Sequence, residues 1–204
     1  MVLWIIESPS LFRKYIGELK YQIGHKDGSF ILSDSDKQLD VEKCMDIVIS
    51  PMEIDVNNKK FINKVYSKLK DISVSEEYYI YTRELIGRIT EYFLNIEKEM
   101  EIDLDYEEVD FNQLLKSLGV KIYDYDGDII EKIGQYLHIS ANLLKKKVIA
   151  FVNLSTYLEI YEIEEIIKEA NYLKINLILI ENHEIDLSMN KKCYIIDKDN
   201  CEIF

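Results

Sequence analysis

Three continuous apolar runs stand out in the hydrophobic pattern of the chain. They read VLWIIE at residues 2–7, VIAFVNL at 148–154 and INLILI at 175–180. Runs of this length without polar alternation are typical of strands covered on both faces of a sheet. Shorter strands are predicted at residues 30–32, 46–50, 193–196 and 202–204. The pattern therefore places strands near both ends of the chain and none in its middle.

Apolar side chains recur at helical spacing between these strands. Ser8 and Pro9 form a start signal for the first helix, and Asp110 and Asp128 each precede a Gln or Glu by three residues, which is the signature of a capping box. The spacing predicts helices over 9–22, from Asn57 or Asn58 to about 69, 76–100, 110–119, 128–144 and 160–172.

This order of elements predicts an α/β fold with two lobes. Residues 1–75 and 145–204 alternate strand and helix, so they are expected to form one α/β head. Residues 76–144 are helical in pattern throughout, and are expected to form an α-helical domain inserted into that head.

Composition limits the setting of the protein. The chain has 204 residues, of which 48% are apolar, so a sizeable core is available. No apolar run reaches the length of a membrane span and no signal-peptide pattern begins the chain, so we expect a soluble cytoplasmic protein without a membrane partner. Three cysteines without a CxxC pair disfavour a disulfide framework or a thiolate metal site.

The net charge of −13 argues against nucleic acid as a partner, but the charge is unevenly distributed. Residues 1–75 carry 11 acidic and 11 basic side chains, whereas residues 76–144 carry 16 and 6. The ends of the chain can therefore present a basic surface while its middle binds cations or stays solvated.

Nucleotide-binding and catalytic motifs are missing from the sequence. Neither G-x-x-x-x-G-K-[ST] nor G-x-G-x-x-G occurs, and Asn153 follows the second apolar run where an NTPase often places a metal-binding Asp. The three histidines are far apart, and no nucleophile elbow is visible. These observations disfavour an enzyme without excluding one.

An acidic run joins two of the predicted helices. Eight of the fourteen residues from 97 to 110 are carboxylates. Carboxylates at this density repel one another unless they are neutralised, and hard oxygen ligands in number are what calcium binds. The segment lacks the spacing of an EF-hand loop, and a solvated acidic loop with Asp110 as a helix cap is an alternative. Residues 123–128 (YDYDGD) are explained more simply by turn chemistry.

Lysines gather on the predicted helix after Asn58. Lys60, Lys64 and Lys68 lie at i, i+4 and i+8, with Lys59 beside them, opposite an apolar face. Such a stripe can follow DNA phosphates without reading bases, although an ordinary solvated helix face is the alternative. Further basic residues could join the stripe in the folded protein, namely Arg13, Lys14 and Lys26.

Seven stretches carry a family resemblance over nearly the whole chain. They are SLFRKYIGEL, GSFILSDSDKQLD, FINKVYSKL, FNQLLKSLGVKI, AFVNLSTYL, EANYLKINLILIEN and CYIIDKDNCEI. Their order and spacing resemble the type II-A CRISPR-associated Csn-two family. That family usually begins with a short strand pair before the strand that VLWIIE matches, so either the head has an unpaired edge or the given start is incomplete.

The resemblance implies a specific function. It implies an α/β head distantly like a P-loop ATPase without the nucleotide site, and a homotetrameric ring whose hole binds linear double-stranded DNA or its ends without sequence preference. Calcium would hold the shape of the ring. The protein would help to capture new spacers in antiviral defence, beside the CRISPR integrase and the RNA-guided nuclease.

The calcium ligands of the family lie near the junction of the lobes. The matching residues of the acidic run are Asp103, Asp105, Glu107, Glu108 and Asp110. We therefore expect a non-enzymatic, calcium-dependent DNA-binding ring. The alternative is a metal-dependent nuclease or phosphotransfer protein that uses the acidic run, and a protein–protein adaptor without a DNA role is a third interpretation.

Overall fold

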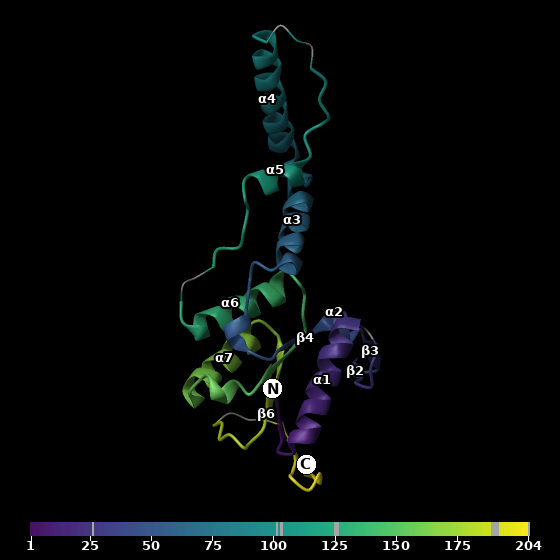
Figure 1. Cartoon of the computed structure of the whole chain (residues 1–204), viewed down its shortest axis with the longest axis vertical. Coiled ribbons are helices and arrows are strands. Elements are labelled where there is room, and N and C mark those ends of the chain that lie inside the picture. Colours follow the sequence, from purple (N-terminus) through teal and green to yellow (C-terminus); the bar gives the residue numbers. More distant parts are fainter. Residues whose placement is uncertain (26, 101, 103, 125–126, 189–191, 204) are drawn as a thin grey trace. The chain divides into compact units, whose positions relative to one another are not determined.

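The fold is mixed α/β, as the sequence predicts. A computed structural model describes residues 1–25, 27–100, 102, 104–124, 127–188 and 192–203. It forms two compact units, Met1–Val56 together with Asp124–Phe204, and Asn57–Tyr123. Figure 1 shows the elements of both units. Among the helices of the described residues, none has both the length and the apolar character needed to cross a membrane.

The first unit is built on a six-stranded sheet in the order β4-β5-β6-β1-β7-β8. All neighbouring strands are parallel except β8, which runs antiparallel to β7. The strands are β1 (Val2–Ile6), β4 (Met45–Val48), β5 (Val148–Val152), β6 (Asn176–Glu181), β7 (Lys192–Ile196) and β8 (Glu202–Ile203). Every residue of β5 is buried, which explains its unbroken apolar sequence.

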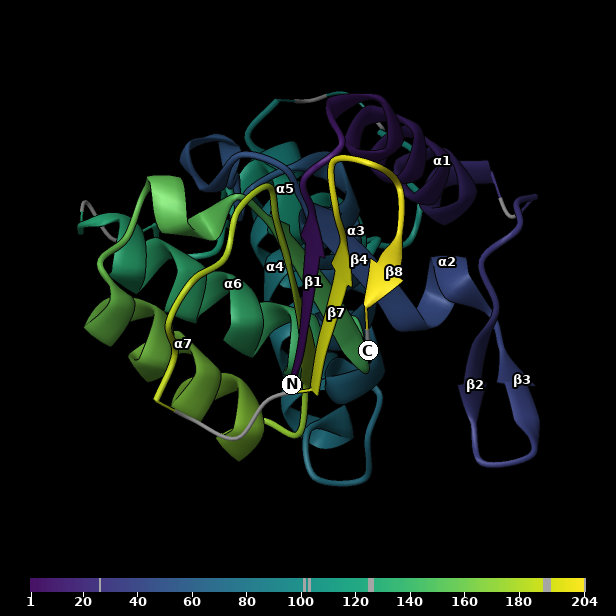
Figure 2. The ribbon, with the colours of Figure 1, turned by 90° about the horizontal axis from the view of Figure 1, so that it is seen from below.

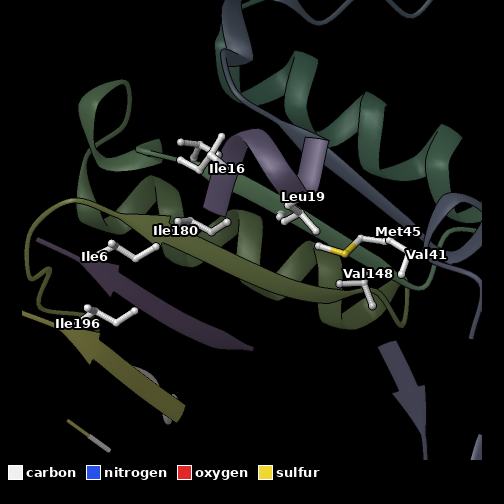
Figure 3. Close-up of a cluster of buried hydrophobic side chains, with 10 residues drawn as sticks. Ile6, Ile16, Leu19, Val41, Met45, Val148, Ile180 and Ile196 are labelled. Carbon is white, nitrogen blue, oxygen red and sulfur yellow. The ribbon is translucent and has the colours of Figure 1, made fainter. Parts of the chain in front are cut away.

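Helices cover both faces of this sheet. Figure 2 shows α6 (Ile129–Asn142) and α7 (Ile160–Tyr172) on one side and α1 (Pro9–His25) on the other. The helix α1 packs through Ile16 and Leu19, which are buried against β-strand residues such as Ile180 and Val148 (Figure 3). Burying a side chain of this size stabilises the fold by roughly 1.5–3 kcal/mol.

Short elements link the strands of the first unit. They are the hairpin of β2 (Leu32–Asp34) and β3 (Lys37–Leu39), the helix α2 (Val41–Cys44) and the 3-10 turns η1 (Pro51–Glu53) and η2 (Leu154–Thr156). We predicted a strand at 30–32 and not the hairpin. Most of its residues are exposed, so they carry no apolar alternation that could reveal it.

A buried lysine holds the short helix α2 against the sheet. Lys146 donates hydrogen bonds to the carbonyl oxygens of Glu42 at 2.5 Å and Met45 at 2.6 Å. Its neighbour Lys147 instead reaches Asp34 at 3.4 Å on the surface. Lys146 therefore holds α2 and the start of β4 to the segment before β5.

The second unit contains α3 (Lys59–Ser73), α4 (Tyr79–Lys98) and α5 (Phe111–Ser117). Its bounds differ from those of the predicted helical lobe at 76–144. The helix α3 packs against α5 and so belongs to the second unit, whereas α6 packs against α7 and so belongs to the first. Sequence periodicity identifies a helix but does not show which neighbour receives its apolar face.

Candidate nucleic-acid interface and metal centre

The helix α3 is fixed at its start and along its length. The side chain of Asn58 accepts a hydrogen bond from the backbone N–H of Phe61 at 3.1 Å and so caps the helix. The preceding Asn57 makes two bonds to Ile122, accepting from its N–H at 2.9 Å and donating to its carbonyl at 3.0 Å. Tyr66 donates to the carbonyl of Val120 at 3.2 Å.

With α3 anchored in this way, its apolar side faces the second unit and its basic side faces solvent. Phe61 is buried, whereas Lys60, Lys64 and Lys68 are exposed, as is Lys59. The helix carries five lysines and a single acidic residue, Asp71, so it is strongly basic although the whole chain is acidic. The structure thus brings four of the predicted DNA-binding lysines together on one solvent-facing helix.

The other predicted basic residues lie in the first unit or outside the described residues. Arg13 and Lys14 are exposed on α1, and the ammonium group of Lys14 lies 5.8 Å from the ring centroid of Tyr15. Lys26 falls outside the described residues. Of the predicted DNA-binding residues, those on α3 therefore form the larger group on a single helix.

The acidic run follows α4 and is fastened to it. The carboxylate of Glu97 accepts hydrogen bonds from the backbone N–H of Leu104 at 2.6 Å and from the hydroxyl of Tyr106. The Tyr106 bond is the main cause that lowers the pKa of Glu97, and it raises the pKa of Tyr106. Arg83 pairs with Glu108 at 3.5 Å farther along the segment.

These contacts spread the carboxylates along the chain instead of gathering them. Asp110 caps α5 by accepting from the N–H of Asn112 at 2.8 Å, as predicted, while Asp105 and Glu107 are exposed. Asp103 lies outside the described residues. Within the part of the chain that the structure describes, no three Asp, Glu, His or Cys side chains converge on a point that could hold a metal ion.

Within the described residues the predicted calcium ligands are not gathered around one point. Calcium takes six to eight oxygen ligands at 2.3–2.6 Å, and two of the predicted ligands are already engaged, Glu108 with Arg83 and Asp110 with the α5 backbone. We assign no ligand to a metal. The dependence on calcium stays a prediction.

The largest departure from expectation is the surface of α4. Its apolar residues repeat at helical spacing, yet none of the twenty residues of this helix is buried. Leu85, Phe93 and Ile96 are among its exposed large side chains, and Tyr81 and Tyr92 are more exposed still. Figure 1 shows α4 with the returning segment beside it. Apolar residues outside the predicted repeat, such as Tyr81 and Tyr92, are the signal in the sequence that could have indicated this surface.

A cavity lies between α4 and the returning segment, with a volume of ≈ 710 Å³. Ile86, Phe93 and Leu94 line it from the helix, and Tyr106 and Val109 line it from the other side. Exposed apolar surface of this kind is typical of interaction sites.

These features define an α/β protein with a mainly parallel sheet and a helical unit that carries a basic helix, α3, and an exposed apolar helix, α4. Residues 22–200 match the model of the family described as CRISPR-associated protein (Cas_Csn2). The chain belongs to this CRISPR-associated family, as its sequence resemblance predicts.

Individual relatives agree with the family assignment. The chain is 27% identical over 196 residues to the CRISPR-associated protein Csn2 of Streptococcus agalactiae, covering 95% of this chain and 86% of that protein. It is 25% identical over 154 residues to the Csn2 protein of Enterococcus faecalis, covering 75% of this chain and 69% of that one.

A solved structure shares the fold. The crystal structure of Stu0660 of Streptococcus thermophilus matches with a TM-score of 0.61 at 12% identity. The match covers 88% of this chain but only 62% of the solved chain. At this identity the likeness concerns the fold alone.

Proposed function

We propose that this CRISPR-associated protein is a non-enzymatic, homotetrameric ring that binds linear double-stranded DNA without sequence preference during spacer acquisition. The observation that carries the proposal is the exposed stripe of Lys60, Lys64 and Lys68 on α3, with Lys59 beside it. These lysines offer positive charge to phosphates from one rigid helix.

The composition of α3 suits contact with phosphates more than the reading of bases. Direct readout of bases depends on bidentate side-chain contacts with base edges inside the major groove. The solvent-facing positive charge of α3 consists of lysines alone. Lysine acts as a point charge toward phosphate, so binding should depend on salt and not on sequence.

Assembly into a ring would use the exposed apolar helix α4 of the second unit. The helix α4 exposes more large apolar side chains than a lone helix in water can keep without cost. A second copy that covers Leu85, Phe93 and Tyr92 would remove this surface from water. A closed assembly would also repeat the α3 stripe around its axis, so that several stripes could contact one duplex.

The remaining parts of the proposal rest on the family. Capture of new spacers would place the protein beside the CRISPR integrase and the RNA-guided nuclease in antiviral defence. Calcium would stabilise the assembly. The described residues assign calcium no ligands, so this part is tested separately by metal addition.

The test is a titration of fluorescein-labelled linear duplexes, followed by fluorescence anisotropy. Two unrelated sequences of equal length should bind with the same affinity, and the affinity should fall steeply as salt rises. A gel of the same DNA with Ca²⁺, Mg²⁺ or Mn²⁺ should show intact duplex. Failure to bind either duplex at low salt would contradict the DNA-binding proposal, and metal-dependent cutting would favour a nuclease.

A further inference from the structure

A cavity of ≈ 400 Å³ opens on one face of the sheet in the first unit. Its base consists of residues from four adjacent strands, β6, β1, β7 and β8. The register of the sheet pairs Trp4 of β1 with Tyr194 of β7 and Ile196 of β7 with Glu202 of β8. Because side chains alternate along a strand, Trp4, Tyr194 and Glu202 lie on the same face. Figure 2 shows β1, β7 and β8 side by side.

Aromatic rings form the wall of this cavity. Trp4 lies 5.4 Å from Tyr15 of α1, measured between ring centroids, and Phe30 lies 6.3 Å from each of them. All three side chains are only partly buried, although Trp4 lies on an inner strand of the sheet. The cavity therefore presents aromatic surface to solvent within a size range that suits a small ligand.

The charge of the lining selects the kind of ligand. Glu202 is its only charged residue among the described residues, and no lysine or arginine lines it. Aromatic faces carry negative electrostatic potential and attract cations. The ammonium group of Lys14 already lies 5.8 Å from the Tyr15 ring centroid, so this wall has a cation near it in the free protein.

We propose that this cavity binds an organic cation, an alkylammonium or guanidinium group whose apolar body contacts the aromatic wall while Glu202 balances its charge. The cation can come from a free small molecule or from a lysine or arginine side chain of a partner protein. This site is independent of the α3 stripe and of DNA binding, so either proposal can fail without the other.

Trp4 provides a reporter, because it is the single tryptophan of the chain. Choline and N-acetylarginine amide serve as probes for the two sources. Their neutral counterparts, 3,3-dimethyl-1-butanol and N-acetylcitrulline amide, have nearly the same shape without the charge. A cationic probe should change the Trp4 emission in a saturable way, and its neutral counterpart should bind at least about fivefold more weakly.

Variants then test the lining. Glu202 and Asp199 are both exposed carboxylates near the β7–β8 turn, so Glu202→Gln and Asp199→Asn remove the same charge a few residues apart. Glu202→Gln should weaken cation binding severalfold, and Asp199→Asn should leave it nearly unchanged. Saturation by choline alone would identify a free cation as the ligand, and saturation by the arginine amide alone a partner side chain. Equal binding of the neutral probes, equal effects of the two variants, or no saturable change would overturn the proposal.

Discussion

The hydroxyl of Ser155 donates a 2.6 Å hydrogen bond to the carboxylate of Glu181, and its backbone N–H donates a second at 3.2 Å. Glu181 is the last residue of β6 and is fully buried, while Ser155 lies in the turn η2 after β5. Beside them the side chain of Asn153, in left-handed backbone conformation, accepts from the N–H of Asn182 at 3.2 Å. These bonds join the carboxyl ends of two neighbouring parallel strands.

This buried carboxylate predicts a pH-dependent stability. Burial raises the pKa of Glu181, while the hydrogen bonds from Ser155 act in the opposite direction. The folded state then binds the proton more tightly than the unfolded state, so Glu181 lowers stability as pH rises from the ordinary glutamate pKa to the raised one. Above that window its effect is constant.

The variant Glu181→Gln cannot titrate, so its melting temperature relative to the parent should rise as pH increases through this window. Thermal melts at intervals from pH 4 to 8 measure the difference. Glu184→Gln removes an exposed carboxylate nearby and should show no such trend. A difference between Glu181→Gln and the parent that does not change with pH would show that the pKa of Glu181 is not raised.

The DNA surface is tested by reversing the charge of α3. The combined change Lys60→Glu, Lys64→Glu and Lys68→Glu should abolish binding at moderate salt, because the side chains that contact phosphates become repulsive. A milder change of the three to Gln should lower the log–log salt slope by about one for each lysine–phosphate pair that it removes. Anisotropy titrations over a salt series measure both.

A matched control changes the same charge elsewhere. Lys20, Lys168 and Lys198 are exposed lysines of the first unit, and their change to Glu alters the net charge by the same amount. This control should retain most of the affinity. If both triple variants lose binding equally, net charge and not the α3 stripe governs the interaction.

Assembly is tested on α4. Leu85 and Phe93 are exposed by 46% and 54%, so the double change to Glu removes apolar surface without disturbing a core. The molar mass measured by light scattering after size exclusion should fall toward that of a monomer, because the apolar surface that joins the copies is lost. Tyr172→Glu, which alters an exposed residue of α7, should keep the assembly of the parent.

Calcium is tested on the acidic run. Millimolar Ca²⁺ should raise the melting temperature and the DNA affinity of the parent relative to EDTA, because an ion that binds only the native state stabilises it by about 2.7 kcal/mol at a hundredfold excess over its Kd. The change Asp105→Asn, Glu107→Gln and Glu108→Gln should remove both responses.

The change Glu184→Gln, Asp186→Asn and Asp199→Asn removes equal charge from exposed positions of the first unit and should retain both responses. No effect of Ca²⁺ on the parent would leave the run as a solvated acidic segment. In that case the contacts that hold the run against α4 are those of Glu97 with Tyr106 and of Arg83 with Glu108.

Local pattern alone determined much of this protein. The buried runs at β1, β5 and β6, the caps at Asp110 and Asp128, and the lysine stripe on α3 all follow from residues close together in the sequence, whereas the α3 cap was narrowed only to Asn57 or Asn58. Each depends on period, capping or composition within one element, which the chain order preserves. The family resemblance likewise needed only the order of short segments.

Only the tertiary structure decided which surfaces these elements bury or leave in solvent. The apolar spacing of α4 is the same whether the helix lies in a core or stands exposed, and the structure leaves it without a buried residue. The acidic run is one continuous segment in the sequence, whereas the structure gives Glu97, Glu108 and Asp110 separate partners. The aromatic cavity joins Trp4, Tyr194 and Glu202 from distant parts of the chain, because pairing between strands, and not proximity in sequence, brings their side chains to one face.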